Sequence, residues 1–131
     1  MKYLKHYSFI FFPNSDENEL TGKDYDWVPN IDILTVKNGA YIVLEVAGVN
    51  KEDIKIELQN KLLVITGVRK RFVPEEECEF YSMEIAEGIF KRKISVPYQV
   101  DIENIKVEIK DGMLKIFVPK ATEVRKEIVI E

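Results

Sequence analysis

The chain is poor in the residues from which most enzyme sites are built. Its 131 residues include one histidine, His6, and one cysteine, Cys78. A tight zinc site needs several such ligands, and Ser-His-Asp or Cys-His catalysis needs a histidine in the folded core. We therefore expect no metal site and no catalytic centre, and an enzyme is the disfavoured class. The single cysteine also excludes an internal disulfide and agrees with a reducing compartment.

Clustered glycine, long apolar runs and excess positive charge are absent as well. The six glycines stand singly, so no loop is suited to cradling a phosphate, and no cofactor is expected. No apolar run approaches the roughly 20 residues of a membrane span. The net charge of −4 gives no electrostatic support for a nucleic-acid partner. The opening MKYLKHYSFIFFP lacks a signal peptide's apolar run and cleavage site, so we expect a mature, cytoplasmic protein.

Short β-type segments separated by turn signals are abundant from Trp27 onward. They are rich in β-branched and aromatic residues or alternate apolar with charged residues, and they are IDILTV (31–36), AYIVLEV (40–46), IKIEL (54–58), LLVITG (62–67), IFKRKISV (89–96), IKVEI (105–109) and MLKIFV (113–118). The turn signals include Lys37-Asn38-Gly39 and Asp111-Gly112. No segment of helical period exceeds about two turns. This pattern predicts an all-β fold, a two-sheet antiparallel β-sandwich.

One stretch of the chain is repeated. VNKEDIKIELQNKLLVI (49–65) matches VDIENIKVEIKDGMLKI (100–116) at a constant offset of 51. Each copy is a short acidic turn followed by a hairpin pattern. The likeness reflects either the alternation that every half-buried strand requires, or two equivalent hairpins on opposite sides of a sandwich that border a common groove. The sequence leaves both interpretations open.

The segment between the two copies, RKRFVPEEECEFYSMEIAEG (69–88), is long for a connection in a compact domain. Loops beyond about 12–15 residues are usually functional. Its acidic run, Glu75 to Glu79, is interpreted as solvated charge. The following FYSMEI (80–85) is strand-like, and a strand inside such a loop can add to the edge of another subunit.

The two ends of the chain are expected to lie outside the main fold. Residues 1–26 combine an aromatic opening with a polar stretch and are predicted to form an arm. The chain closes on EIVIE. In an extended strand Ile128 and Ile130 point the same way, so both can enter one pocket while Val129 faces away. The triplet either closes its own sandwich or docks on a neighbour, and the spacer ATEVRKE favours the neighbour.

Three motifs together resemble the small heat shock proteins. VEIKDGMLKIFVPK (107–120) is similar to that family's A-x-x-x-n-G-x-L signature, with Gly112 and Leu114 at signature positions and Val107 where alanine is usual. Residues 88–97 match G-x-F-x-R-x-[FI]-x-[VL]-P, and residues 27–32 match W-x-P-x-x-D. The resemblance covers about residues 27–120, the extent of the β pattern. It implies an immunoglobulin-like α-crystallin domain over 27–120, an N-terminal arm over 1–26 and a C-terminal extension over 121–131.

The resemblance also implies how the subunits assemble. In the bacterial, archaeal and plant members, a loop strand pairs with the strand after the Trp motif of a partner, and Arg92 sits near this interface. The implied interface residues are Phe80, Tyr81, Ser82, Met83, Glu84, Ile85, Arg92, Ile31 and Ile33. A vertebrate-type dimer is disfavoured because it lacks the long loop. The I-x-I tail (Ile128, Val129, Ile130) would dock on another dimer, in a groove formed by Ile54, Ile56, Leu58, Ile105, Val107 and Ile109.

The function implied is that of an ATP-independent holdase, which binds partly unfolded proteins and prevents their aggregation. Its partners are unfolded clients and further copies of itself, with no nucleic acid and no membrane span. The client-binding candidates are the apolar residues of the arm, namely Tyr3, Leu4, Tyr7, Phe9, Ile10, Phe11 and Phe12. The arm can instead fill only the interior of the oligomer. The alternative function is a monomeric or dimeric co-chaperone module that binds one folded partner.

Overall fold

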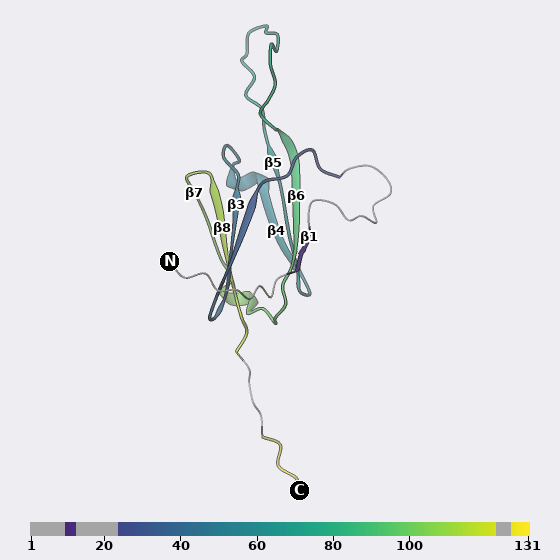
Figure 1. The fold of residues 1–131 in the computed structure, drawn as a ribbon, viewed down its shortest axis with the longest axis vertical. Coiled ribbons are helices and arrows are strands. Elements are labelled where there is room, and N and C mark those ends of the chain that lie inside the picture. The colour runs from purple at the N-terminus through teal and green to yellow at the C-terminus, as the bar shows by residue number, and fades with distance from the viewer. Residues whose placement is uncertain (1–9, 13–23, 123–126) are drawn as a thin grey trace.

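The computed structural model describes residues 10–12, 24–122 and 127–131, which form two packed antiparallel sheets (Figure 1). The first sheet has the strand order β1-β6-β5-β4, and the second has the order β2-β3-β8-β7. The strands are β1 (Ile10–Phe12), β2 (Ile31–Val36), β3 (Gly39–Glu45), β4 (Ile54–Gln59), β5 (Leu62–Arg69), β6 (Gly88–Ser95), β7 (Lys106–Lys110) and β8 (Met113–Pro119). Short 3-10 turns, η1 (Lys51–Asp53) and η2 (Ile102–Asn104), precede β4 and β7. The predicted sandwich is confirmed.

The core lies between the sheets and is filled by alternate residues of the central strands. On β5 every second residue from Leu63 to Gly67 is buried, and β3 and β8 alternate in the same way. The largest fully buried side chains are Phe90, Ile42, Leu44, Leu63, Ile65, Ile94, Leu114 and Ile116. Because side chains on a strand alternate between faces, a register slip of one residue would expose this whole set. The hydrophobic pattern therefore fixes the register.

The repeated sequence forms two equivalent hairpins, as one of the two interpretations predicts. The first copy is η1-β4-β5 and the second is η2-β7-β8, and the two 3-10 turns lie at the same offset of 51. Each copy places its first strand at the edge of a different sheet. The turns use left-handed backbone, with φ of 60° at Asn60, 52° at Asp111 and 76° at Gly112. Asn, Asp and Gly are the residues that tolerate this conformation best.

The predicted arm is not wholly separate from the sandwich, which corrects the sequence-based expectation. Its residues Ile10–Phe12 form β1 and pair with β6. Asp26 accepts a hydrogen bond from the Ile89 backbone N–H at 2.7 Å, and Lys91 donates to Asp24 at 2.6 Å, which lowers the pKa of Asp24. The first contact gives a backbone N–H at the outer edge of β6 a partner, and the second is a side-chain ion pair on the same strand. A strand of three residues is too short to show a period of two. The rest of the predicted arm lies outside the described residues.

The described part of the chain lacks both a membrane-spanning helix and a cluster of metal ligands. No helix there is long and apolar enough to cross a membrane. No group of three or more His, Cys, Asp or Glu residues there is arranged to hold a metal ion.

Candidate functional site

An apolar groove lies between the edge strands of the two repeated hairpins. It has a volume of about 230 Å³ and is lined by Lys51, Ile54, Ile56, Val107, Ile109 and Leu114. Both β4 and β7 end their sheets, so their inward side chains are covered on one side only. Ile54, Ile56 and Ile109 are accordingly half-buried, and Val107 is 52% exposed.

Four of the six residues predicted for this groove line it. The other two, Leu58 and Ile105, pack against the core as Ile54, Ile56 and Ile109 do, but they are not among the residues that line the groove. Lys51 and Leu114 were not predicted. Leu114 belongs to β8, the second strand of its hairpin, and its inward direction follows from the same alternation that places Ile116 in the core. That signal was present in the sequence.

The free edges beside the groove also offer backbone hydrogen-bonding groups. The β7–β8 hairpin closes on the pair Lys110↔Met113, and the β4–β5 hairpin closes on Gln59↔Leu62. The closing pair of a two-residue hairpin is hydrogen-bonded, and hydrogen-bonded pairs then recur at every second residue. The alternate residues Val107 and Ile109 therefore direct their N–H and C=O groups away from β8. An added strand can bond to the same residues whose side chains line the groove.

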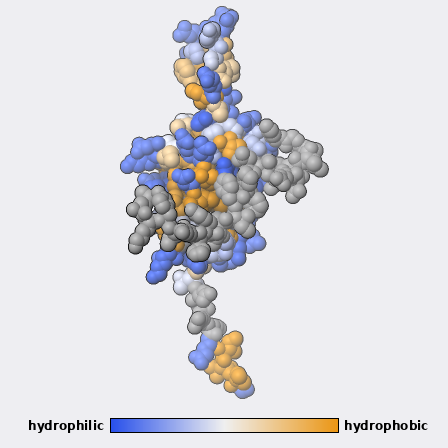
Figure 2. Space-filling view, viewed as in Figure 1, coloured by the Kyte–Doolittle hydropathy of each residue, from blue (hydrophilic) through white to orange (hydrophobic). Residues whose placement is uncertain are grey.

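The C-terminal tail presents an apolar triplet without cover. Residues 127–131 form no strand, so the structure does not show the tail closing its own sandwich. Ile128, Val129 and Ile130 are 83%, 81% and 94% exposed. The end of the chain lies beyond the sandwich in Figure 1, and the triplet forms the orange cluster at that end in Figure 2.

A second open edge belongs to β2, the strand that the resemblance names as the acceptor in a dimer. β2 pairs with β3 on one side only within the described residues. Ile31 and Ile33 are half-buried and pack against the core, whereas Leu34 and Val36 are 52% and 44% exposed on the other face. This edge is therefore open to the addition of a further strand.

The long loop between β5 and β6 projects away from the sandwich, at the top of Figure 1. The segment expected to be a strand, Phe80–Ile85, forms none in the single chain. Its large apolar side chains are exposed, at 52% for Phe80, 103% for Tyr81, 56% for Met83 and 73% for Ile85. Ser82 and Glu84 make a contact of 3.4 Å with each other. A strand needs a paired neighbour, and a single chain supplies none at this place.

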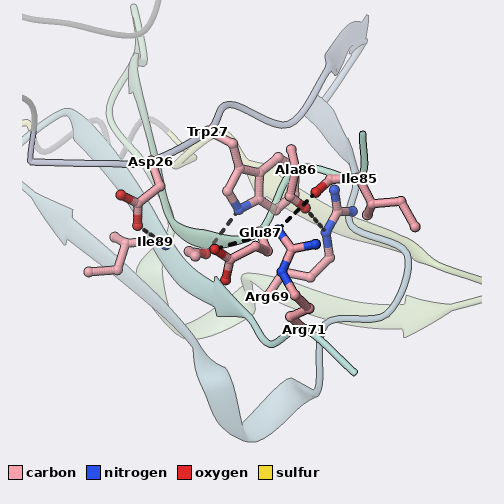
Figure 3. Close-up of polar contacts among 9 residues, drawn as sticks. Asp26, Trp27, Arg69, Arg71, Ile85, Ala86, Glu87 and Ile89 are labelled. Carbon is pink, nitrogen blue, oxygen red and sulfur yellow. Dashed lines mark hydrogen bonds and ion pairs between the residues drawn. The ribbon is translucent and has the colours of Figure 1, made fainter. Parts of the chain in front are cut away.

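Arg69 ties the base of the loop to the sandwich (Figure 3). Its Nε donates to the Ala86 carbonyl at 2.8 Å, and its Nη1 donates to the Ala47 carbonyl at 3.1 Å. Its guanidinium lies 3.9 Å from the centroid of the Trp27 ring, and the Trp27 Nε1 donates to the Gly88 carbonyl at 2.9 Å. The Arg69 side chain thus links the two legs of the loop to each other. These contacts fix the direction in which the loop leaves the domain. No feature of the sequence indicated this role for Arg69.

Arg71 makes similar contacts one step further along the loop. It donates to the Ile85 carbonyl at 3.5 Å, pairs with Glu87 at 3.7 Å, and lies 5.6 Å from the centroid of the Phe80 ring. Figure 3 shows Arg69 and Arg71 side by side against residues 85–87. These contacts therefore join the start of the strand-like segment to the two legs of the loop.

Arg92, predicted near the dimer interface, is 6% exposed and lies on β6. Its Nη1 donates to the Pro29 carbonyl at 3.0 Å. This bond links β6 to the segment that leads into β2. Burial lowers the pKa of Arg92. The role of Arg92 at a dimer interface stays a prediction, whereas its hydrogen bond to Pro29 within one chain is present in the structure.

Comparison with known proteins places this geometry in a family. Residues 32–131 match the model of the Hsp20/alpha crystallin family. Spore protein SP21 of Stigmatella aurantiaca is 30% identical over 99 residues, which are 76% of this chain and 59% of that protein. Small heat shock protein C2 of Rickettsia felis is 30% identical over 86% of this chain and 70% of that protein. The chain thus spans a little over half the length of the first relative.

Solved structures agree. The small heat-shock protein from Xylella fastidiosa superposes with a TM-score of 0.69 at 27% identity, covering 81% of this chain and 98% of that one. The hspA protein from Xanthomonas axonopodis gives a TM-score of 0.63 at 29% identity, covering 72% and 94%. On the family match and on this shared fold, the chain belongs to the Hsp20/α-crystallin family of small heat shock proteins.

Proposed function

We propose that this chain is an ATP-independent holdase chaperone that works from a dynamic homo-oligomer of strand-exchanged dimers. It binds unfolded or partly unfolded proteins and prevents their aggregation. The observation that supports this most is the exposed apolar triplet Ile128–Ile130 together with an apolar groove at the open edges of β4 and β7. A chain that exposes an apolar tail and an apolar groove, with the tail not bound in the groove of the same chain, is suited to reversible assembly with other copies.

The dimer forms through the projecting loop. Residues 80–85 of one subunit add as a strand to the free edge of β2, which contains Ile31 and Ile33, in the partner. The exposure of Phe80 and Met83 in the single chain supports this, because strand addition gives such side chains a surface to cover. The contacts of Arg69 and Arg71 hold the base of the loop in place before the partner arrives, which reduces the entropy cost of pairing.

The dimers assemble further through their tails. Burying two isoleucines contributes roughly 3–6 kcal/mol before the cost of ordering the tail is subtracted. A single contact of this kind is weak, and many contacts in a closed assembly hold through multivalency. The relative from Xylella fastidiosa is described as having a distinct high-order structure, which agrees with such an arrangement.

Clients bind to the apolar surfaces that assembly covers. Partly unfolded proteins expose strand edges and apolar side chains. The groove emptied when Ile128 and Ile130 detach offers both an edge and an apolar lining. The N-terminal arm is the second client surface in this proposal, although residues 1–9 lie outside the described residues. The exposed thiol of Cys78 agrees with a reducing, cytoplasmic location.

A light-scattering assay with a heat-labile enzyme as client, without ATP, tests the holdase activity. Scattering is expected to be suppressed when chaperone subunits and client are present in equal amounts. Full aggregation of the client under these conditions would refute the activity. Native mass measured over a temperature series tests the assembly, and a monomer at every temperature would favour the co-chaperone alternative.

Substitutions in the tail test the mechanism of assembly. Ile128→Gly combined with Ile130→Gly is expected to reduce the assembly to dimers with the domain still folded. Val129→Gly is the control in the same segment, because it also loosens the backbone, with one glycine instead of two, but removes a side chain that faces away from the groove. Equal native masses for the two variants would show that the groove does not hold the isoleucines.

A further inference from the structure

The segment that precedes β2 is bonded to the start of β6. Residues 24–27, which we call the strap, lie at the outer edge of this strand. The backbone of Ile89 is bonded to the strap twice. The Asp26 N–H donates to the Ile89 carbonyl at 2.6 Å, and the Asp26 carboxylate accepts from the Ile89 N–H at 2.7 Å. Val68 of β5 pairs with Ile89 on the other side, so β6 is held from both edges where the long loop returns to the sandwich.

Trp27 is the part of the strap that reaches the loop. Its ring meets the Phe90 ring edge to face with centroids 5.2 Å apart, and its Nε1 donates to the Gly88 carbonyl at 2.9 Å. The guanidinium of Arg69 lies over the same indole ring and donates to the Ala86 carbonyl. The strap, the outgoing leg of the loop and its returning leg therefore meet around one side chain (Figure 3).

The strap and the returning leg leave no room for a side chain at Gly88. This residue has φ of 101°, and a Cβ built there would overlap the Asp26 carboxylate. Glycine permits both the left-handed backbone and the close approach. Because the leg and the Asp26 side chain fill adjoining space, the position of one constrains the position of the other.

The strap also lies between the parts of the chain that the proposed dimer uses. Toward the C-terminus it leads into β2, the acceptor edge, and Arg92 fixes this connection through the Pro29 carbonyl. The loop that Trp27 and Arg69 hold carries residues 80–85, the strand that is proposed to be exchanged. One cluster of contacts thus joins the acceptor strand of a subunit to the base of the loop that the same subunit donates.

We propose that the strap is a clasp that positions the loop for strand exchange. When the clasp is closed, the loop leaves the sandwich in the direction that pairing requires. When it is open, the loop is loose and the dimer opens more readily. This inference rests on the proposed dimer and names the device that controls it. A loop held at its base loses less conformational entropy on pairing than a loose loop does.

Subunit exchange in the full-length chain tests the clasp. Isotope-labelled and unlabelled chains are mixed, and native mass follows assemblies with an odd number of labelled subunits, which appear only when dimers open. Asp26→Ala removes the acceptor of the Ile89 N–H and is expected to speed their appearance about fivefold. Asp26→Asn keeps an oxygen acceptor and is expected to stay within about twofold. Trp27→Phe keeps a ring beside Phe90 but loses the donor to Gly88, and an increase of about threefold is expected.

Asp24→Ala is the matched control. It makes the same substitution two residues earlier in the strap, where the carboxylate pairs with the side chain of Lys91 and not with the loop. This pair is partly exposed, so the rate is expected to change less than about twofold. A thermal melt at one protein concentration confirms that each variant is folded.

A double-variant cycle tests whether the contacts act as one unit. Arg69→Ala releases the loop from the other side of Trp27 and is also expected to speed exchange about fivefold. Asp26→Ala combined with Arg69→Ala is expected to give about tenfold, because a clasp that is already open has little left to lose. Independent sites would give roughly 25-fold, and that result would contradict a single clasp.

Amide hydrogen exchange keeps the remaining outcomes apart. Asp26→Ala is expected to accelerate it at residues 85–88 while β3 and β8 stay protected. Faster amide exchange with an unchanged rate of dimer opening would refute control of the dimer and leave the proposed dimer standing. Unchanged amide exchange, or an equal effect of Asp24→Ala, would show that the strap does not hold the loop. A chain that is monomeric at every concentration would overturn the proposed dimer and this role together.

Discussion

The two repeated hairpins have the same pattern and the same local structure, yet they meet different neighbours. Each begins with a 3-10 turn, places its first strand at a sheet edge and its second strand beside a central strand. The first continues into the projecting loop at residue 70, and the second continues into the tail at residue 120. A repeated unit thus gives the chain two equivalent edges, and the segments that follow are the two that the proposed assembly uses.

The difference is clearest at the corresponding positions 67 and 118. In the first hairpin this residue is Gly67, and a Cβ built there would lie 2.3 Å from atoms of the Phe90 ring. In the second hairpin the residue is Val118, which is fully buried and fills its own space. In the first sheet, the Phe90 ring of β6 occupies the space that a side chain at residue 67 would need. The two hairpins have the same backbone pattern but different side chains at positions 67 and 118, because the neighbouring strand determines how much space is left for the side chain.

The largest effect is expected where Phe90 covers Gly67. Phe90→Ala is expected to lower the free energy of unfolding by about 3–5 kcal/mol, because it leaves a cavity. Gly67→Val is expected to cost about 1–3 kcal/mol through overpacking. The double variant is expected to be more stable than the sum predicts, because the valine occupies part of the cavity. Urea unfolding at one fixed protein concentration measures all three, and strictly additive losses would contradict the shared space.

A smaller effect is expected at the corresponding positions 69 and 120. Arg69→Ala removes two hydrogen bonds and the contact with Trp27, and it is expected to cost about 2 kcal/mol. Amide hydrogen exchange at residues 85–88 is expected to accelerate, because the leg of the loop is released. Lys120→Ala is the control in the second hairpin, with an expected change within about 0.5 kcal/mol. Unchanged exchange in Arg69→Ala would show that the loop is held by other contacts.

The turns of the hairpins provide a third contrast. Gly112 has φ of 76°, and a Cβ there would lie 3.1 Å from the Ala47 Cα. Gly112→Ala is expected to cost about 1 kcal/mol, because the left-handed backbone disfavours a side chain. The corresponding residue, Lys61, does not have a positive φ, so Lys61→Ala is expected to be neutral within about 0.5 kcal/mol. Thermal melts compare the two, and equal melting temperatures would mean that the turns tolerate alanine alike.

The smallest effect is expected on the outer side of β4. Glu57→Gln breaks the pair with Lys55, yet both side chains are solvent-exposed, at 37% and 73%. We expect no measurable change in melting temperature, because water and salt screen such pairs. A clear drop in a low-salt melt would show that the pair holds the edge of β4.

The hydrophobic alternation was sufficient to predict the strands of the sandwich but not all of its edges. Strand β2 coincides with the predicted 31–36, β7 is shifted by one residue from the predicted 105–109, and β8 extends one residue beyond the predicted 113–118. Alternation over five to eight residues is a strong signal. The four groove residues that were anticipated came from the resemblance to the family. β1 was missed because three residues carry almost no periodicity.

Contacts between distant segments were the part that the sequence did not reveal. The residues next to Arg69 in the sequence do not indicate that it donates a hydrogen bond to Ala47. The motif around Trp27 does not indicate that the Trp27 ring contacts Arg69. Gly67 is an exception, because an isolated glycine in a strand often marks a close approach. The pattern of residues 80–85 predicted a strand, and the single chain forms none there, because a strand requires a paired neighbour.

The sequence by itself determined the β-sandwich, the twin hairpins and the apolar triplet EIVIE, because these depend on local periodicity and turn residues. Only the tertiary structure decided that β4 and β7 border one groove, that β6 is covered by β1, and that Arg69 fixes the loop. These depend on which segments meet across the fold, and residues far apart in sequence carry no mark of their meeting.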